Sequence, residues 1–186
     1  MSTVAMDLGC WIETASGMQF SLSRPQASMV SIEDIAHALG NLCRFVGHTP
    51  EFYSVAQHSV IVADLVRTPT IQLAALLHDA HEAYIGDFSR PMKELLGECG
   101  MSIRGIEGDI QDAIHQRFGV TVDAITKRAI KEADNKALAV EAWNFMPSKG
   151  STWTPPAPCD GFHIMALSPK DASEAFLDRF RRYSKS

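Results

Sequence analysis

The run Leu77-His78-Asp79-Ala80-His81-Glu82 constrains the fold most, because it puts polar groups where a helix should fill a core. At helical pitch, one stripe of this region carries six residues, namely Ile71, Ala74, Ala75, His78, Glu82 and Ile85. An imidazole and a carboxylate therefore take core positions. A buried carboxylate without a partner is strongly unfavourable, so it is normally paired or bound to a cation. The stripe predicts a metal site.

Two other predicted helices carry the same anomaly. His58 lies on an apolar stripe with Val62, and Asp134 lies on one with Ile130. A single buried histidine is more often a hydrogen-bonded core residue, but several such groups together favour a shared cation. If the three helices pack side by side, one divalent ion is enclosed by His58, His78, Asp79 and Asp134.

The predicted ligand set mixes two imidazole nitrogens with two carboxylates. It does not match the all-oxygen preference of Ca²⁺, and it lacks the thiolates typical of structural zinc. A catalytic ion is therefore expected. The candidate cofactor is a divalent metal, namely Co²⁺, Mn²⁺, Zn²⁺, Mg²⁺, Fe²⁺ or Ni²⁺.

The remaining sequence predicts a mainly helical chain. Its 186 residues suit a single domain, 1–186, with a core over about 31–146. A small β-hairpin is expected over 10–22, and the other expected elements are helices over about 32–39, 54–68, 70–84, 89–96, 102–118, 121–145 and 168–184. The fold class is thus all-α, a helical bundle with an N-terminal hairpin. The stretch 147–158 contains four prolines, which indicates either a structural loop or a lid over a substrate.

Composition restricts the partners and the compartment. Seventeen basic against 22 acidic side chains give a net charge of −5, so a nucleic acid polymer is not expected as a partner. The four cysteines form no C-x-x-C pair, and we interpret them as reduced thiols. Apolar runs are too short to cross a bilayer and the first twenty residues lack a basic leader region, so no membrane contact and a cytoplasmic location are expected.

The motifs resemble those of the HD-domain metal-dependent phosphohydrolases, which carry a histidine, an adjacent His-Asp pair and a distant aspartate. The similarity is greatest to the YfbR-like 5′-deoxynucleotidases and the DatZ-like phage dATP triphosphohydrolases, and it covers about residues 35–141. The matching segments are Arg44-Phe45, Ser54-Val55-Ala56-Gln57-His58, Leu77 to Glu82, Gly86-Asp87, Pro91-Met92-Lys93 and Lys131-Glu132-Ala133-Asp134.

The resemblance implies a role for each matching polar residue. His58, His78, Asp79 and Asp134 would be the metal ligands, with Asp79 also counted among the catalytic residues. Arg44 would orient the phosphate through its planar donors, and Glu82 would assist proton transfer or hold a second ion. The alternatives are a surface ion pair for Arg44 and a helix-face charge for Glu82.

The resemblance also implies substrate contacts outside the ligand set. Asp87 would contact the sugar, although it could simply cap the next helix. Phe45 replaces the tryptophan of the 5′-deoxynucleotidases and keeps an apolar wall. Lys93 could bind outer phosphates, although a solvated lysine is the simpler interpretation. His81 would either add to a two-metal site or support the first ligands.

We therefore expect an enzyme that removes phosphate from 5′-(deoxy)nucleotides with a divalent metal. The first alternative is a deoxynucleoside triphosphate triphosphohydrolase of the dATP type. Other activities found on this kind of site, such as cleavage of cyclic dinucleotides or di-iron oxygenation, are a further alternative. A non-catalytic sensor that binds metal and nucleotide belongs to a different class. The resemblance also implies a homo-oligomer.

Overall fold

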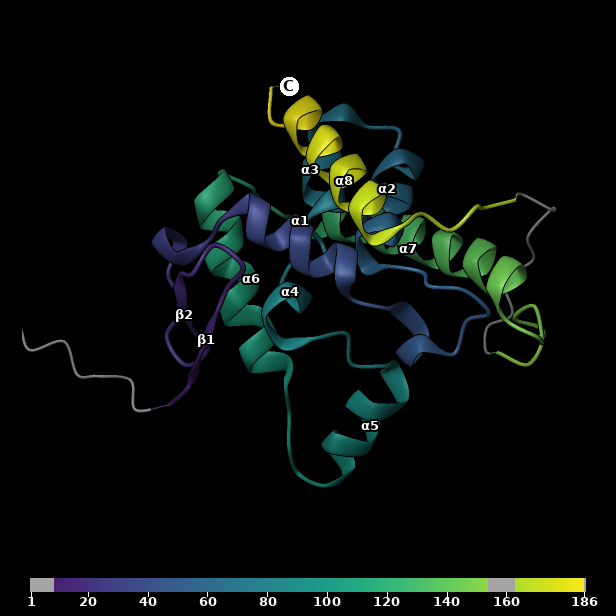
Figure 1. The fold of residues 1–186 in the computed structure, drawn as a ribbon, viewed down its shortest axis with the longest axis horizontal. Coiled ribbons are helices and arrows are strands. Elements are labelled where there is room, and N and C mark those ends of the chain that lie inside the picture. The colour runs from purple at the N-terminus through teal and green to yellow at the C-terminus, as the bar shows by residue number, and fades with distance from the viewer. Residues whose placement is uncertain (1–8, 154–162, 186) are drawn as a thin grey trace, which may run out of the picture.

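The computed structural model describes residues 9–153 and 163–185, and it is mainly helical with one two-stranded antiparallel hairpin (Figure 1). This confirms the predicted all-α class with a hairpin. The described elements are β1 Trp11–Glu13, β2 Gln19–Ser21, η1 Ala27–Met29, α1 Ile32–Asn41, η2 Arg44–Gly47, α2 Val55–Leu65, α3 Pro69–Leu76, α4 Glu82–Ile85, α5 Arg90–Glu98, α6 Arg104–Phe118, α7 Ala124–Phe145 and α8 Pro169–Tyr183.

Of the predicted proline-rich loop, residues 147–153 form turns and 154–158 lie outside the described residues. No helix in the described part of the chain is both long enough and apolar enough to cross a bilayer.

Side-chain caps define where several helices begin. Ser31, Ser54 and Ser168 each accept a hydrogen bond from the backbone N–H three residues later, at the starts of α1, α2 and α8. Asp123 does the same for α7. Each cap satisfies a donor that the first turn of a helix leaves free. These polar residues therefore set the register in which the following apolar faces meet.

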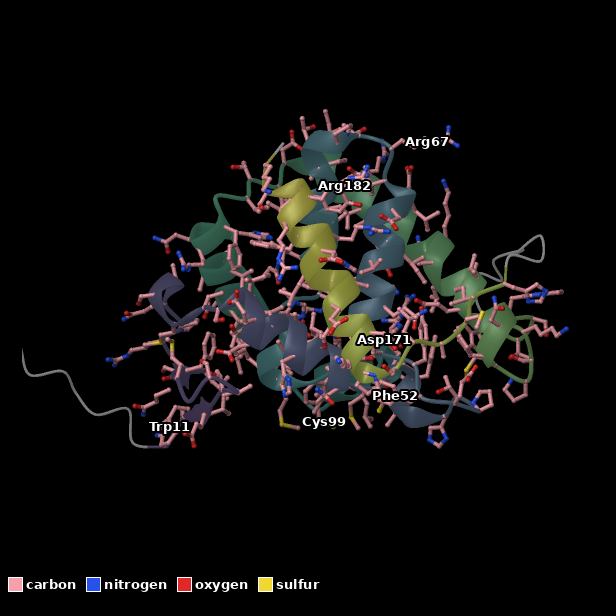
Figure 2. All side chains as sticks on the ribbon, turned by 45° about the horizontal axis from the view of Figure 1, so that its top comes forward. Trp11, Phe52, Arg67, Cys99, Asp171 and Arg182 are labelled. Atoms are coloured by element: carbon pink, nitrogen blue, oxygen red, sulfur yellow. The ribbon has the colours of Figure 1, made fainter. Side chains whose placement is uncertain are left out.

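Helix α2 lies at the centre of the bundle and contacts α1, α3, α7 and α8. Its side chains join one continuous core that includes Ile35, Leu39, Leu76 and Phe176. Helix α8 lies across α1 and α2, with Asp171 at its N-terminal end and Arg182 at its C-terminal end (Figure 2). Negative charge at the start and positive charge at the end of a helix both suit its dipole.

The hairpin is attached to the helices by a polar and an apolar contact. Asp34 on α1 accepts hydrogen bonds from Ser16 N at 2.8 Å, from Ser16 Oγ at 2.7 Å and from Thr14 Oγ1 at 2.8 Å, all in the hairpin turn. On β2, the ring of Phe20 stacks on Tyr84 of α4, with ring centroids 3.7 Å apart. The hairpin thus packs against both α1 and α4.

The predicted helix over 70–84 is wrong in one respect, because it is not continuous. Helix α3 ends at Leu76, Leu77 leaves the helical region with ψ of 7°, and α4 begins only at Glu82. Between them the backbone bonds span three residues, as in His78 N to Ala75 O at 3.4 Å and Ala80 N to Leu77 O at 3.1 Å. Such a tight segment inside a helix often marks a functional site. Here it contains the His-Asp pair.

Gly40 lets α1 and α8 approach closely, so we predict that Gly40→Ala destabilises the fold by about 1–3 kcal/mol. A Cβ at this position would overlap Ser173 Oγ and lie 2.8 Å from the carbonyl oxygen of Pro169. Urea unfolding followed by circular dichroism measures the change. Gly108→Ala is the control, because a Cβ on this exposed position of α6 meets nothing within 4 Å. It should raise stability by about 0.5–1 kcal/mol. A Gly40→Ala variant as stable as the wild type would contradict the proposed close approach.

Candidate metal centre

Four of the predicted site residues come together from three parts of the chain. His58 lies on α2, His78 and Asp79 lie in the turn between α3 and α4, and Asp134 lies on α7. His58 Nε2 is 3.4 Å from Asp134 Oδ1 and 3.6 Å from Asp79 Oδ2, while His78 Nε2 is 3.1 Å from Asp79 Oδ2. One potential ligand atom each from His58, His78 and Asp134 lies within 4.8 Å of the others. This buried group could hold a metal ion.

The outer ring nitrogens of both histidines are occupied. His58 Nδ1 donates to Glu141 Oε1 at 2.6 Å, and His78 Nδ1 donates to the carbonyl oxygen of Ala75 at 2.8 Å. Each Nε2 therefore presents a lone pair toward the cluster when the ring is neutral. Both Nε2 atoms are buried and have no hydrogen-bond partner among the described residues. Histidines that bind metals usually have this arrangement, in which the second ring nitrogen donates to a carboxylate or a carbonyl.

Three separations between imidazole and carboxylate atoms of the cluster fit one ion. Two atoms that each bind the same ion at about 2.1 Å lie roughly 3.0 to 3.4 Å apart at octahedral or tetrahedral angles. The separations of 3.1 to 3.6 Å between the imidazole and carboxylate atoms are close to this range. The chemistry of the donors also fits, since neutral imidazole and ionised carboxylate are both metal ligands. The residues present thus fit a divalent ion.

Electrostatics keep the two aspartates ionised. Burial opposes ionisation of Asp79, but the adjacent His78 and then His58 hold its pKa well below the usual value. Burial likewise opposes ionisation of Asp134, and the contact with His58 lowers its pKa nevertheless. Burial lowers the pKa of His58, yet its carboxylate neighbours raise it to about 9. Without a metal, a proton on His58 supplies the positive charge that the two carboxylates require, and a bound ion would replace it.

Glu141 of α7 was not predicted, although it organises the inner side of the cluster. Its side chain is fully buried and accepts three hydrogen bonds: from His58 Nδ1 at 2.6 Å, from Tyr53 Oη at 3.0 Å and from Arg44 Nη2 at 3.0 Å. Although burial opposes ionisation, Arg44 and His58 hold the pKa of Glu141 at about 2. The pattern that revealed Asp134 also contains Glu141, seven residues later and so two turns further along the same apolar stripe. Its position in that stripe was the available signal.

Arg44 is a buried residue, so the alternative of a surface ion pair is wrong. It begins the tight turn η2, in which Phe45 and Val46 both adopt left-handed backbone angles with φ of 54°. Such angles are uncommon for residues other than glycine, and strained residues cluster at functional sites. The turn directs the guanidinium group to Glu141 and leaves the Phe45 ring 5.2 Å from the Arg44 Cζ atom. The same ring lies 5.8 Å from the ring of Trp153, between centroids.

The other predicted substrate and proton-transfer residues lie on the α4 and α5 side of the cluster. Glu82 is buried and its Oε2 atom has no hydrogen-bond partner among the described residues. Burial and the nearby carboxylates of Asp79 and Asp87 raise its pKa well above the usual value. Burial also raises the pKa of Asp87, against the lowering influence of Arg44. Lys93 does not stand free in solvent, because its Nζ is 2.8 Å from Glu107 Oε1 of α6.

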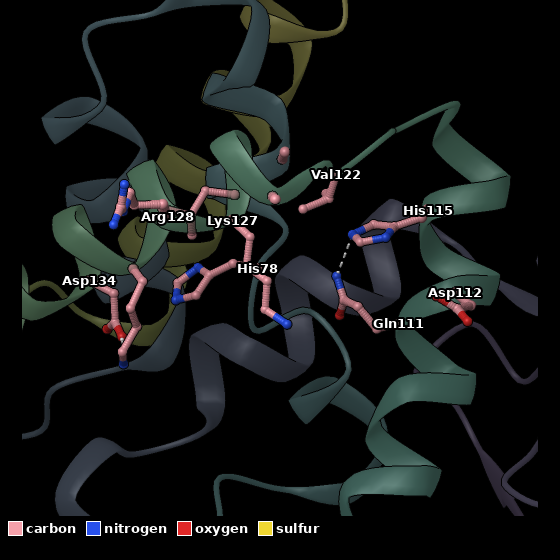
Figure 3. Close-up of a pocket in the computed structure, with 12 residues that line it drawn as sticks. His78, Gln111, Asp112, His115, Val122, Lys127, Arg128 and Asp134 are labelled. Carbon is pink, nitrogen blue, oxygen red and sulfur yellow. Dashed lines mark hydrogen bonds and ion pairs between the residues drawn. The ribbon is translucent and has the colours of Figure 1, made fainter.

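A cavity of about 660 Å³ lies between α6 and α7, with His78 among its lining residues (Figure 3). His78 and Asp134 form part of its wall, so a molecule in the cavity would lie against the cluster. The other lining residues include three cations of α7, namely Lys127, Arg128 and Lys131. Lys131 Nζ contacts the second carboxylate oxygen of Asp134 at 2.7 Å. The lining also contains Asp112, so three cations face two carboxylates and the cavity carries a small excess of positive charge next to the candidate ligands.

We predict that Glu82→Gln stabilises the metal-free protein, and increasingly so as the pH rises. Because its pKa is raised by folding, Glu82 contributes stability that is complete below the unfolded pKa of about 4.3 and is lost as the pH rises through the folded pKa. Glutamine cannot ionise and avoids this loss. Thermal unfolding of the two metal-free proteins between about pH 4 and pH 8 should show a widening difference in Tm. Glu132→Gln, at an exposed position of α7, is the control and should show none. A difference that stays constant or narrows with pH would contradict the environment described for Glu82.

Comparison with known proteins places the chain in a family. No family model matches the sequence. The Escherichia coli (strain K12) protein YfdR, described as uncharacterized, is 35% identical over 179 residues, which cover 94% of this chain and 96% of YfdR. The Rhodobacter capsulatus protein RCAP_rcc00048, also described as uncharacterized, is 38% identical over 142 residues, or 71% of each chain. The chain belongs to the same family as YfdR.

Proposed function

We propose that this protein is a divalent-metal-dependent phosphohydrolase that removes phosphate from 5′-(deoxy)nucleotides. One observation carries the proposal. Two buried imidazole Nε2 atoms without hydrogen-bond partners among the described residues face two ionised aspartates, beside a buried arginine. The resemblance of the motifs to those of HD-domain phosphohydrolases supports the same reaction class, and it remains part of the proposal.

His58, His78, Asp79 and Asp134 would hold the ion. When bound, a divalent ion withdraws charge from a phosphoryl oxygen and lowers the pKa of water, so that hydroxide is available near neutral pH. Arg44 binds the phosphoryl group. One edge of its guanidinium group is fixed by Glu141, and its buried Nε atom has no hydrogen-bond partner among the described residues. A planar cation held in this way can stabilise the charge that develops on phosphate oxygens.

Glu82 transfers a proton. Its raised pKa allows the buried carboxyl group to hold a proton closer to neutral pH than an exposed glutamate does. It can then protonate the leaving oxygen of the nucleoside. Asp87 and Phe45 belong to the side that receives the sugar and the base, and Trp153 extends the aromatic surface that Phe45 begins.

The proposal predicts metal-dependent turnover that requires Asp134. Nucleoside mono- and triphosphates are incubated with Mn²⁺, Co²⁺ or Mg²⁺, and phosphate, pyrophosphate and triphosphate are measured separately. Asp134→Asn should lower metal affinity and activity by at least ~100-fold, because loss of a ligand exceeds the effect of losing a supporting residue. Asp109→Asn, at an exposed position of α6, is the control and should behave as the wild type.

The screen also separates the proposal from its alternatives. Turnover of no nucleotide by protein with metal bound would refute it. Tight nucleotide binding without hydrolysis, measured by calorimetry, would favour the non-catalytic sensor. Two bound irons with consumption of dioxygen would favour the oxygenase.

The cavity between α6 and α7 favours a second candidate, the triphosphohydrolase. Its three cations line the same cavity as two candidate ligands, and phosphate groups beyond the reacting one would extend among them. A local excess of positive charge raises the concentration of an anionic ligand. A nucleoside triphosphate would use these cations, whereas a monophosphate would not reach them.

The two candidates predict different effects of neutralising the cavity. Lys127→Gln combined with Arg128→Gln should raise KM for a deoxynucleoside triphosphate by about 10-fold, with little change for the monophosphate. Steady-state kinetics with both substrates at fixed ionic strength measures this. Arg67→Gln combined with Lys136→Gln removes the same charge from exposed positions of the chain and is the control. Equal effects of the two double variants, or equal effects on the two substrates, would contradict use of the cavity by a phosphate chain.

A further inference from the structure

We propose that Gln111 of α6 is a positioning residue for the metal centre, because it holds both ends of the turn that carries His78 and Asp79. Its amide nitrogen donates to the carbonyl oxygen of Leu77 at 2.7 Å. Its amide oxygen accepts from the backbone N–H of His81 at 3.3 Å. One side chain thus connects the residue before the His-Asp pair to the residue two positions after it.

The orientation of the amide group is determined by these two partners. A backbone carbonyl oxygen can only accept a hydrogen bond, and a backbone N–H can only donate one. The nitrogen of Gln111 must therefore face Leu77 and its oxygen must face His81. No exchange of the two amide atoms satisfies both contacts.

Gln111 occupies the place of a missing helical hydrogen bond. In a continuous α-helix the N–H of His81 would donate to the carbonyl oxygen of Leu77, four residues earlier. The amide of Gln111 instead lies between these two groups and bonds to both. Insertion of a side chain into the backbone ladder is a recognised cause of a helix break. This insertion explains why the predicted helix over 70–84 divides into α3 and α4.

The break has a consequence for metal binding. On a regular helix, neighbouring residues point about 100° apart, which makes a shared ion difficult for His78 and Asp79. In the tightened turn, His78 Nε2 and Asp79 Oδ2 are 3.1 Å apart, a separation suited to ligands of one ion. The insertion of Gln111 thus holds the backbone in the form that brings the pair together.

The Gln111 amide makes two further hydrogen bonds, one through its second N–H and one through the second lone pair of its oxygen. Gln111 Nε2 is 2.9 Å from His115 Nε2, and Gln111 Oε1 is 3.1 Å from His81 Nδ1. Since the amide oxygen can only accept, His81 Nδ1 must carry a proton. In the neutral ring this leaves His81 Nε2 as a lone pair, which is buried and without a hydrogen-bond partner in the described part of the chain. All four hydrogen-bonding positions of the Gln111 amide are therefore filled, which fixes the side chain in one arrangement.

Cobalt binding tests this inference without relying on turnover. Gln111→Met keeps the length of the side chain and removes all four hydrogen bonds. We expect Co²⁺ to bind this variant about 10–100-fold more weakly than the wild type, with altered visible absorption bands at saturating Co²⁺, because the two ligands on the turn are no longer held together. Gln111→Glu keeps the acceptor for His81 but loses the donor for Leu77, so its affinity should lie between the two.

Gln72→Met is the matched control. The amide nitrogen of Gln72 donates to the carbonyl oxygen of Val66 at 3.1 Å, so this substitution also removes an amide-to-backbone hydrogen bond, but at the end of α2. It should leave both the Co²⁺ affinity and the absorption bands unchanged. Wild-type affinity and bands in folded Gln111→Met would overturn the inference, and so would the same loss in Gln72→Met.

A measurement on the wild type covers the case in which the Gln111 variants do not fold. Long-range ¹H–¹⁵N spectra of the metal-free protein report which ring nitrogen of His81 is protonated. We expect the proton on Nδ1, and a proton on Nε2 alone would overturn the inference. The inference about Gln111 and the proposed function can fail independently of each other. Co²⁺ binding that depends on Gln111 can be present even if no nucleotide is hydrolysed.

Discussion

The rest of the centre depends on the contacts made by one fully buried carboxylate, that of Glu141. Taking a carboxylate out of water costs several kcal/mol unless charge and hydrogen bonds compensate. Here an imidazole, a phenol and a guanidinium group all donate to it. In return, Glu141 orients the ring of His58 and holds Arg44, so one buried charge positions both a candidate ligand and the candidate phosphate-binding group. Loss of this carboxylate would leave Arg44 buried without its ionic partner.

Two places where the backbone departs from regular helix geometry carry candidate site residues. The turn η2 adopts left-handed angles at Phe45 and Val46 and begins with Arg44. The turn between α3 and α4 replaces helical hydrogen bonds with shorter-range ones and contains His78 and Asp79. The left-handed angles of the first turn are strained, and such strain persists only where the surrounding structure imposes it. In this protein Glu141 restrains the first turn through Arg44, and contacts from α6 restrain the second.

Sequence patterns were sufficient for most of the helices and for the candidate ligands. The helices predicted over about 32–39, 54–68 and 168–184 are present as α1, α2 and α8, and His58 and Asp134 stood out because they interrupt apolar stripes. The break after Leu76 could not be predicted in the same way, because the group that competes for its backbone lies 34 residues later in the chain. Gln111 itself interrupts no apolar pattern, so only the folded arrangement reveals its contacts. Local sequence rules thus point to candidate ligands, whereas long-range hydrogen bonds decide the shape of the turn that carries two of them.

The attachment of the hairpin to α4 affects how the centre responds to partial unfolding. A helix of four residues has little stability of its own, and α4 begins with Glu82. It is supported by the stacking of Phe20 on Tyr84, while the hairpin turn is fastened separately to Asp34. Heat or denaturant that detaches the small hairpin would thus remove one support of α4, which also packs against α1, and loosen the position of Glu82 while the larger helices remain packed. The proton transfer proposed for Glu82 would then be lost at a temperature below the melting point of the bundle.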